Sequence, residues 1–510
     1  MQVSWVVQGS DEHGAVSLPP APTQDPAFSE TEVVTRIRGT LTLYEHGRAV
    51  QDRPNDALIC SPDTPSPSFL SAGTSTAGRW SAPFSWPIVA LHASLLYNGQ
   101  VLSWGKFGQP YLWDPATSHF SQVPLQSWIF CAGHAFLPDG RLLVAGGHLS
   151  DDRGIPDANV FSPRYQTWTR VGSMARGRWY PTNTELADGS ILTLAGRDAN
   201  GVTVPLPEIW SSAGWRALTG ASRNLAYYPR SFLAPNGKVF YAGESQTSRY
   251  LSTSGAGAWT TVGLRQYGTR DYGAAVMYEP GKILYAGGGR TTATAEIVDL
   301  NQAAPAWQYT GSMAYPRRHL NATLLPDGTV LVTGGSSGTS FSDYTRGVHA
   351  AELWTPATGA WTTLASNTVT RVYHATSLLL PDGRVLHTGS GDASGQPDQR
   401  NAELFSPPYL FKGARPTISS APTRAAYGSA FTVTTADAAS ITRVALIGLG
   451  SVTHAFDMGQ RYLTPGFSRT STGLTVTAPS TRNTAPPGFY MLFVLNGSGV
   501  PSVAKFIRIG

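Results

Sequence analysis

The stretch RVYHATSLLLPDGRVLHTGS, residues 371–390, holds the pattern that decides the fold. Its second half is typical of a β-hairpin, because a Pro-Asp-Gly turn joins two apolar strands and Asp-Gly tolerates the positive φ of tight turns. Tyr373 and His374 stand side by side at the start of the first strand. The hairpin recurs along the chain, whereas this Tyr-His pair occurs once, so the hairpin bears on the fold and the pair on the chemistry.

Seven copies of this hairpin repeat along the chain in steps of 41 to 55 residues. They read YNGQVLSWG, LPDGRLLVAGG, LADGSILTLAG, APNGKVFYAGE, YEPGKILYAGG, LPDGTVLVTGG and LPDGRVLHTGS. In most copies a further strand, a turn and a Trp follow. Such spacing, with four short strands per unit, is that of a kelch-type β-propeller. We predict an all-β protein with seven blades, because the alternative, a pair of β-sandwiches, does not repeat one motif seven times in register.

The repeats divide the chain into three predicted parts. Residues 1–76 are an irregular N-terminal extension with one strand pair, VVTRIRGTLTLYEHG, that packs on the propeller or closes its last blade. Residues 77–413 are the propeller, whose first blade opens near Gly78 to Trp80. Residues 414–510 carry alternating strands at the spacing of an immunoglobulin-like sandwich.

Composition excludes several classes of function. The net charge of +5 is mild for 510 residues and no dense Lys/Arg run occurs, so nucleic acid is not an expected partner. No apolar run approaches 18 residues, so no membrane span is expected. The N-terminus MQVSWVVQGSDEHG lacks the regions of a signal peptide, although we expect a secreted or cell-envelope protein, and a monomer.

The repeat also serves as a ruler for candidate site residues. In each blade the strand before the turn is expected to be innermost, so its start lies at one rim of the central channel. Eight residues before the turn Asp, or its equivalent, stand Ala90, Cys131, Tyr180, Tyr228, Tyr272, His319 and His374. Cys131, Tyr180, Tyr373 and His374 are therefore expected to converge at that rim. The ruler nominates Tyr228, Tyr272 and His319 equally well.

Each candidate alone has an ordinary structural explanation. Cys131 fits a buried inert thiol, Tyr180 and Tyr373 fit hydrogen-bonded channel tyrosines, and His374 fits an inner-strand histidine. Together they are an unusual set for packing alone. Phenolate and imidazole ligands suit Cu(II) in a tetragonal site.

From about Gly78 to the C-terminus the chain resembles the radical copper oxidases, the family of galactose oxidase and glyoxal oxidase. The resemblance rests on WIFCAGHAFLPDGRLLVAGG, ARGRWYPTNTELADG, RVYHATSLLLPDGRV, LGSVTHAFDMGQRYLTP and the ending PPGFYMLFVLNGSGVPSVAKFIRI. It implies copper ligands at Tyr180, Tyr373, His374 and His454, the last in a sandwich loop. It also implies that Cys131 and Tyr180 form a thioether cofactor that carries a radical.

The Arg-Trp-Tyr-Pro run resembles glyoxal oxidases more closely, and this resemblance implies that Trp179 stacks over the thioether. Without the resemblance, Trp179 would be a core Trp and His454 a surface-loop residue. The family's mechanism implies a primary alcohol or hydrated aldehyde as substrate, Tyr373 as general base, hydrogen abstraction by the Tyr180 radical, and reduction of O2 to H2O2.

Two features place galactose in doubt as the preferred substrate. The short AGGGRTTATAEI segment lacks the loop that helps galactose oxidase hold its sugar, and we expect no counterpart of the N-terminal sugar-binding domain of galactose oxidase. Arg230 is only a loose counterpart of the sugar-binding arginine. The alternatives are a non-catalytic kelch module that binds carbohydrate or protein, and a propeller hydrolase or lyase, for which no rim carboxylate pair is found. Of the two cysteines, Cys60 is expected to stay a free, structural thiol.

Overall fold

The structure of the protein is a computed structural model, and it describes residues 8–11, 14–17, 40–45, 48–54 and 73–510. The chain divides into two units, Met1–Phe69 and Leu70–Gly510. The first unit contains two antiparallel hairpins, β1 (Gln8–Asp11) with β2 (Gly14–Ser17) and β3 (Thr40–Glu45) with β4 (Arg48–Pro54). The strand pair predicted within residues 33–47 is thus shifted, because β3 pairs with a strand that follows this segment. Cys60 lies outside the described residues.

Seven antiparallel sheets of the second unit are the propeller blades. In blades 1 to 6 the four blade strands follow chain order from the inner to the outer edge, and blade 7 ends in two strands from the start of the unit. Blade 1 consists of β7 (His92–Leu95), β8 (Val101–Trp104), β9 (Tyr111–Asp114) and β10 (His119–Gln122). Blade 2 consists of β11 (Gly133–Phe136), β12 (Leu142–Ala145), β15 (Ala158–Ser162) and β16 (Thr167–Val171). Blade 3 consists of β17 (Thr182–Glu185), β18 (Ile191–Leu194), β19 (Glu208–Ser211) and β20 (Gly214–Ala217). Blades 4 and 5 are β21 (Ser231–Leu233), β22 (Val239–Tyr241), β23 (Thr247–Ser252), β24 (Ala258–Leu264); and β25 (Ala274–Glu279), β26 (Lys282–Ala286), β27 (Ala295–Asp299), β28 (Gln308–Tyr309). Blades 6 and 7 are β29 (Asn321–Leu324), β30 (Val330–Thr333), β31 (Ala350–Thr355), β32 (Ala360–Ser366); and β33 (Ala375–Leu379), β34 (Val385–Gly389), β35 (Asn401–Ser406) with β5 (Arg79–Trp80) and β6 (Phe84–Ser85).

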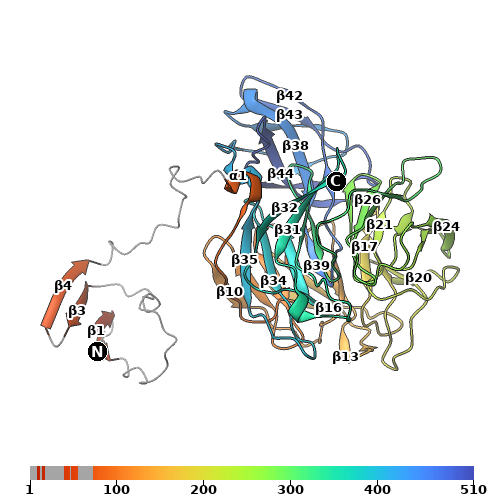
Figure 1. Ribbon diagram of the computed structural model, residues 1–510, viewed down its shortest axis with the longest axis horizontal. Helices are drawn as coiled ribbons and strands as arrows, with labels where there is room; N and C mark the ends of the chain where they lie inside the picture. The colour runs from red at the N-terminus through yellow and green to blue at the C-terminus, as the bar shows by residue number, and fades with distance from the viewer. Residues whose placement is uncertain (1–7, 12–13, 18–39, 46–47, 55–72) are drawn as a thin grey trace. The chain divides into compact units, whose positions relative to one another are not determined.

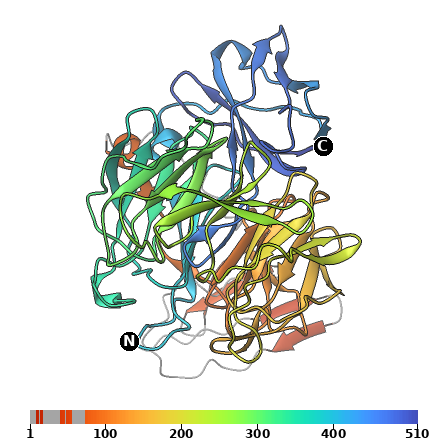
Figure 2. The ribbon, with the colours of Figure 1, turned by 90° about the vertical axis from the view of Figure 1, so that its right-hand side faces the viewer.

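The innermost strands form a ring. β11 contacts β17, β17 contacts β21, β25 contacts β29, β29 contacts β33, and β33 contacts β7, which joins the last blade to the first. In Figure 2 the green middle blades lie opposite the orange and yellow first blades, with the blue C-terminal sandwich above them. The predicted fold class, a seven-bladed propeller followed by an immunoglobulin-like sandwich, is confirmed.

The seventh blade is closed by a strand from the other end of the unit. β5 and β6 both pair with β35, so that Trp80 lies opposite Phe405 and Phe84 opposite Ala402. This corrects the prediction that the first blade opens near Gly78 to Trp80. The hairpin ruler could not reveal it, because closing strands lie upstream of the first copy of the motif.

The C-terminal sandwich packs a five-stranded sheet against a three-stranded sheet around its own apolar core. The larger sheet has the order β36 (Arg424–Ala425), β45 (Lys505–Ile509), β44 (Gly488–Asn496), β38 (Ile441–Gly448), β41 (Tyr462–Leu463) and the smaller β37 (Ala430–Thr434), β43 (Gly473–Thr477), β42 (Phe467–Arg469). A further hairpin, β39 (Ser451–Thr453) and β40 (Phe456–Asp457), leaves the sandwich and joins the inner edge of blade 1. Figure 1 shows β39 among the propeller strands, away from β42 and β43.

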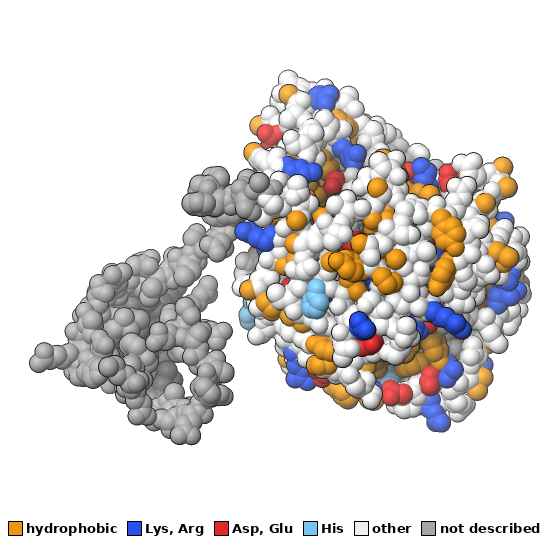
Figure 3. Space-filling view, in the orientation of Figure 1, with side chains coloured by type: hydrophobic (Ala, Val, Ile, Leu, Met, Phe, Trp, Pro, Cys, Tyr) orange, Lys and Arg blue, Asp and Glu red, His pale blue; other side chains and the backbone are white. Residues whose placement is uncertain are grey.

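Short helices are few among the described residues. They are α1 (Thr74–Ala77), η2 (Tyr344–Arg346), η3 (Pro408–Phe411) and η4 (Ala438–Ser440). None of the described helices is long and apolar enough to cross a membrane. On the face shown in Figure 3, positive and negative side chains are interspersed, in keeping with the mild net charge.

Buried Arg–Glu pairs anchor the rim of four blades. Each pair joins the loop before the innermost strand to the third strand of the same blade, at 2.6 to 3.3 Å, and both side chains are almost fully buried. The pairs are Arg178–Glu208, Arg270–Glu296, Arg317–Glu352 and Arg371–Glu403. Each arginine stands two residues before a candidate rim residue, so these pairs hold the rim in place.

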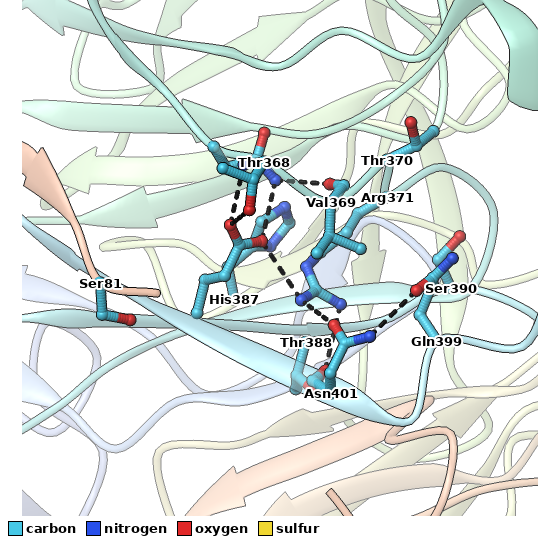
Figure 4. A network of polar contacts seen from close by, with 12 residues as sticks. Ser81, Thr368, Val369, Thr370, Arg371, His387, Thr388, Ser390, Gln399 and Asn401 are labelled. Carbon is cyan, nitrogen blue, oxygen red and sulfur yellow. Dashed lines mark hydrogen bonds and ion pairs between the residues drawn. The ribbon is translucent and has the colours of Figure 1, made fainter. Parts of the chain in front are cut away.

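The pair in blade 7 belongs to a larger network, shown in Figure 4. Arg371 donates to the carbonyl of Gly389 at 3.0 Å and to the side chain of Asn401 at 2.6 Å. Glu403 also accepts from the backbone N–H and hydroxyl of Thr368, both at 2.8 Å. Because Arg371 and Glu403 are both buried and each has several hydrogen-bond partners, the loop that carries Tyr373 and His374 is held in one conformation.

Removing Glu403 should therefore destabilise the propeller strongly. The substitution Glu403→Ala leaves the Arg371 guanidinium buried and unpaired, and we expect a loss of about 3–5 kcal/mol in the free energy of unfolding. Urea denaturation measures it. As a matched control, Glu279→Ala breaks the half-exposed pair with Lys282 and should cost at most about 1 kcal/mol. Equal costs for the two variants would contradict the anchoring role.

Candidate functional site

The six rim residues of blades 2 to 7 share an unusual backbone conformation. Their φ angles are all positive, between 43° and 69°. The six are Cys131, Tyr180, Tyr228, Tyr272, His319 and His374. A left-handed backbone is uncommon outside glycine and costs about 1–2 kcal/mol per residue, so it persists where the surrounding structure enforces it, often at functional sites.

Backbone hydrogen bonds connect the rim turns of successive blades, which are the turns that precede their innermost strands. The N–H of Tyr180 donates to the carbonyl of Cys131 at 3.0 Å, and the N–H of Tyr228 donates to that of Tyr180 at 3.0 Å. The N–H of Cys131 donates instead to the His92 side chain of blade 1, at 3.1 Å from Nε2. These bonds bring residues that are 39 to 49 positions apart in sequence into one continuous rim.

The sandwich hairpin delivers His454 to this rim. Thr453 of β39 pairs with His92 of β7, and His454 and Ala455 form the two-residue turn between β39 and β40. Both turn residues have positive φ, 46° and 63°, as a tight hairpin turn of this hand requires. The ring of His454 lies 4.5 Å from that of Tyr180 and 4.7 Å from that of His374, centroid to centroid.

His374 and His454 both present an unprotonated Nε2. The Nδ1–H of His374 donates to the carbonyl of Gly391 at 2.7 Å. The Nδ1 of His454 lies 2.6 Å from the hydroxyl of Thr453, which itself donates to the carbonyl of Leu91, so the imidazole is the donor. Each ring therefore has its lone pair on Nε2, and both Nε2 atoms are buried without a hydrogen-bond partner.

Burial keeps both imidazoles neutral. It lowers the pKa of His374 to about 3, and it lowers the pKa of His454 well below its usual value. A neutral imidazole whose Nδ1–H is held by an oxygen and whose Nε2 is free is the form that binds metal ions.

The hydroxyls of Tyr180 and Tyr373 complete the polar set. Their oxygens lie 2.5 Å apart and share a hydrogen bond. Burial is the main cause that raises the pKa of each well above its usual value, so a cation is needed to bring them to the phenolate form. Among the described residues no group of three or more His, Cys, Asp and Glu side chains is placed to hold a metal, and the candidate ligands here are two histidines and two tyrosines.

Cys131 and Trp179 lie on Tyr180. Cys131 is a buried free thiol whose pKa is raised by burial and, in smaller part, lowered by a hydrogen bond with Tyr180. It shares one buried cluster with Trp179 and Tyr180. The Trp179 ring is stacked on the Tyr180 ring, with centroids 3.7 Å apart and planes inclined by 17°. The structure thus brings together all six residues that the sequence nominated.

The other ruler residues also lie at this rim. The ring of Tyr228 stacks on that of His454 at 4.6 Å. Tyr272 and His319 lie beside Tyr373, with ring centroids 5.6 Å and 5.0 Å away. They form a second layer of aromatic side chains around the two phenols.

Arg230 supports the site through contacts with the backbone. It is buried and donates to the backbone carbonyls of Tyr228, Gly273 and His454, at 2.7 to 3.2 Å. The guanidinium holds the turn of His454, and four of its five N–H donors are directed at backbone carbonyls. Sequence reasoning missed this role, and it missed the acceptors Gly391 and Thr453, because no side-chain pattern marks a residue that acts through its backbone or through a neighbour.

The chain is similar to several known proteins. A family model described as "Galactose oxidase-like, Early set domain" matches residues 415–509. The chain is 30% identical over 489 residues to a galactose oxidase of Gibberella zeae, covering 85% of this chain and 70% of that protein. It is 29% identical over 462 residues to the aldehyde oxidase GLOX of Vitis pseudoreticulata, covering 80% and 87%.

A solved structure is also similar. It is described as a "novel fungal alcohol oxidase with catalytic diversity among the AA5 family, in complex with copper", with a TM-score of 0.79, 27% identity and coverage of 85% of this chain and 100% of that chain. These relatives show that the chain belongs to the radical copper oxidase family, which contains the galactose and glyoxal oxidases. It is therefore an oxidoreductase. The two identities are nearly equal, so a closer relation to glyoxal oxidases stays a prediction.

Proposed function

We propose that this chain oxidises primary alcohols or hydrated aldehydes with O2 and releases H2O2, at a copper ion held by His374, His454, Tyr180 and Tyr373. The observation that carries the proposal is the pair of buried, unpartnered Nε2 atoms beside two phenol oxygens. Two imidazole nitrogens and two phenolate oxygens suit Cu(II). Copper, when bound, supplies one of the two oxidising equivalents and a position at which the substrate oxygen binds.

The chain supplies the second oxidising equivalent. We infer that Cys131 and Tyr180 lose one hydrogen each to O2, which leaves as H2O2, and form a thioether. The substituted phenol of Tyr180 is then reversibly oxidised by one electron. Trp179, stacked at 3.7 Å, covers the ring and excludes water from it. In this scheme Tyr180 takes a hydrogen atom from the substrate carbon.

Tyr373 is the proposed general base. Its oxygen is in a short hydrogen bond with Tyr180, and a bound cation would lower the pKa of its hydroxyl so that the proton can be lost. As phenolate it accepts the hydroxyl proton of the substrate. The two hydrogens removed from the substrate end on O2 as H2O2, which balances the reaction. The secreted or cell-envelope location and the monomeric state predicted above remain predictions.

The thioether is the first testable consequence. After exposure to copper and air the protein should be lighter than its sequence by two hydrogen atoms, and Cys131→Ser should abolish this difference. Intact-mass and peptide-mapping spectra measure it. A free thiol fully retained at Cys131, or a disulfide between Cys60 and Cys131, would contradict the radical mechanism.

The His454 ligand is the second consequence. His454→Ala should leave the propeller folded but reduce copper affinity by at least about 100-fold, since loss of a residue that merely orients a ligand already costs 10–100-fold. Isothermal titration with copper measures it. The exposed His119, replaced by Ala, is the matched control and should change nothing. Near-normal affinity and turnover in His454→Ala would show that the sandwich is only a structural cap.

The third consequence concerns the substrate. Because Arg230 is engaged with backbone carbonyls and the sugar-holding loop is short, we expect glycolaldehyde, methylglyoxal or simple primary alcohols to give a higher kcat/KM than galactose. Peroxide release measures the rates. A kcat/KM for galactose more than about tenfold higher, or about 1.4 kcal/mol of transition-state free energy, would contradict the proposed preference for small aldehydes and simple alcohols.

A further inference from the structure

His148 lies outside the proposed ligand set but is bonded to the side chain that covers it. It begins β13 (His148–Ser150), which pairs with β14 (Arg153–Gly154) in a short hairpin between the second and third strands of blade 2. The indole Nε1–H of Trp179 donates to Nδ1 of His148 at 3.2 Å. Both side chains are buried, with 9% and 3% of their surface exposed.

The direction of this hydrogen bond fixes the state of His148. An indole N–H only donates, so Nδ1 must carry a lone pair and the ring proton must be on Nε2. Burial lowers the pKa of His148 to about 4, so the ring is neutral near pH 7. The Nε2 side faces the carboxylate of Asp151 at 3.7 Å, and Asp151 is in turn paired with Lys106 at 3.0 Å.

Two aromatic rings hold His148 in place. Trp128 contacts it edge to face, with centroids 4.4 Å apart, and Phe130 lies 5.0 Å away. The same Phe130 lies edge-on to His374 at 5.9 Å. His148 is therefore a rigid acceptor, set at a defined position relative to the rim.

We propose that His148 is a positioning residue that favours the oxidised form of the Cys131–Tyr180 cofactor because it accepts a hydrogen bond from the indole N–H of Trp179. This inference rests on the proposed function. A donated hydrogen bond increases the electron density of the indole ring. An electron-rich ring stacked at 3.7 Å stabilises an electron-poor oxidised phenol more than the reduced one, because stacked rings interact through their charge distributions. The bond also fixes the tilt of the Trp179 ring.

The test compares His148→Leu, which cannot accept, with His148→Gln, whose side-chain oxygen can. In copper-loaded protein with the thioether verified by mass, a redox titration followed by absorbance measures the midpoint potential of the cofactor. We expect His148→Leu to shift the equilibrium about fivefold toward the reduced form, the effect of one hydrogen bond, and His148→Gln to restore at least part of the shift. In copper-free protein, the indole 15N–1H resonance that Trp179→Phe removes should move in His148→Leu.

A double-mutant cycle separates this role from packing. In a Trp179→Phe background, which has no donor, His148→Leu should cause no further change in potential. An unchanged potential in His148→Leu, or an equal shift in the Trp179→Phe background, would overturn the inference. Failure of the thioether to form in the unsubstituted chain would instead overturn the proposed function.

Discussion

The site depends on two neutral imidazoles from different domains that share one buried space. Each can do so because a fixed oxygen accepts its Nδ1 proton, the carbonyl of Gly391 for His374 and the hydroxyl of Thr453 for His454. Without these acceptors either ring could turn its N–H toward the site and lose its metal-binding lone pair. The uncompensated Nε2 atoms are costly in an empty protein, and a bound cation would offset that cost.

The propeller supplies rigidity for this arrangement, at a cost in backbone strain. Six rim residues have positive φ. Hydrogen bonds between the rim turns of neighbouring blades and buried Arg–Glu pairs hold this part of the chain in place. Strain of this kind persists only where the scaffold over-determines it. The sandwich hairpin uses the same device, since His454 sits in a turn with positive φ and Arg230 holds its carbonyl. Two domains thus fix one site through backbone geometry rather than through flexible side chains.

The fold was predictable because the hairpin repeats seven times, and the rim residues were predictable because the repeat places them at a constant distance from its turn. The resemblance added His454 and Trp179, which no repeat marks. What the sequence did not reveal acts through long-range pairing or through the backbone. Closure of blade 7 by Trp80 and Phe84, and the roles of Arg230 and His148, depend on contacts between segments that are far apart in the chain and carry no local pattern.

The central claim is that copper is bound by one imidazole from the propeller and one from the sandwich. Pulsed electron paramagnetic resonance of the Cu(II)-loaded protein counts coordinated imidazoles directly through their remote nitrogens. Samples in which His374 and His454 are replaced singly by glutamine assign them. We expect two coordinated imidazoles in the unsubstituted protein and one in each variant. Fewer than two imidazoles in the unsubstituted protein, or two retained in either variant, would contradict it.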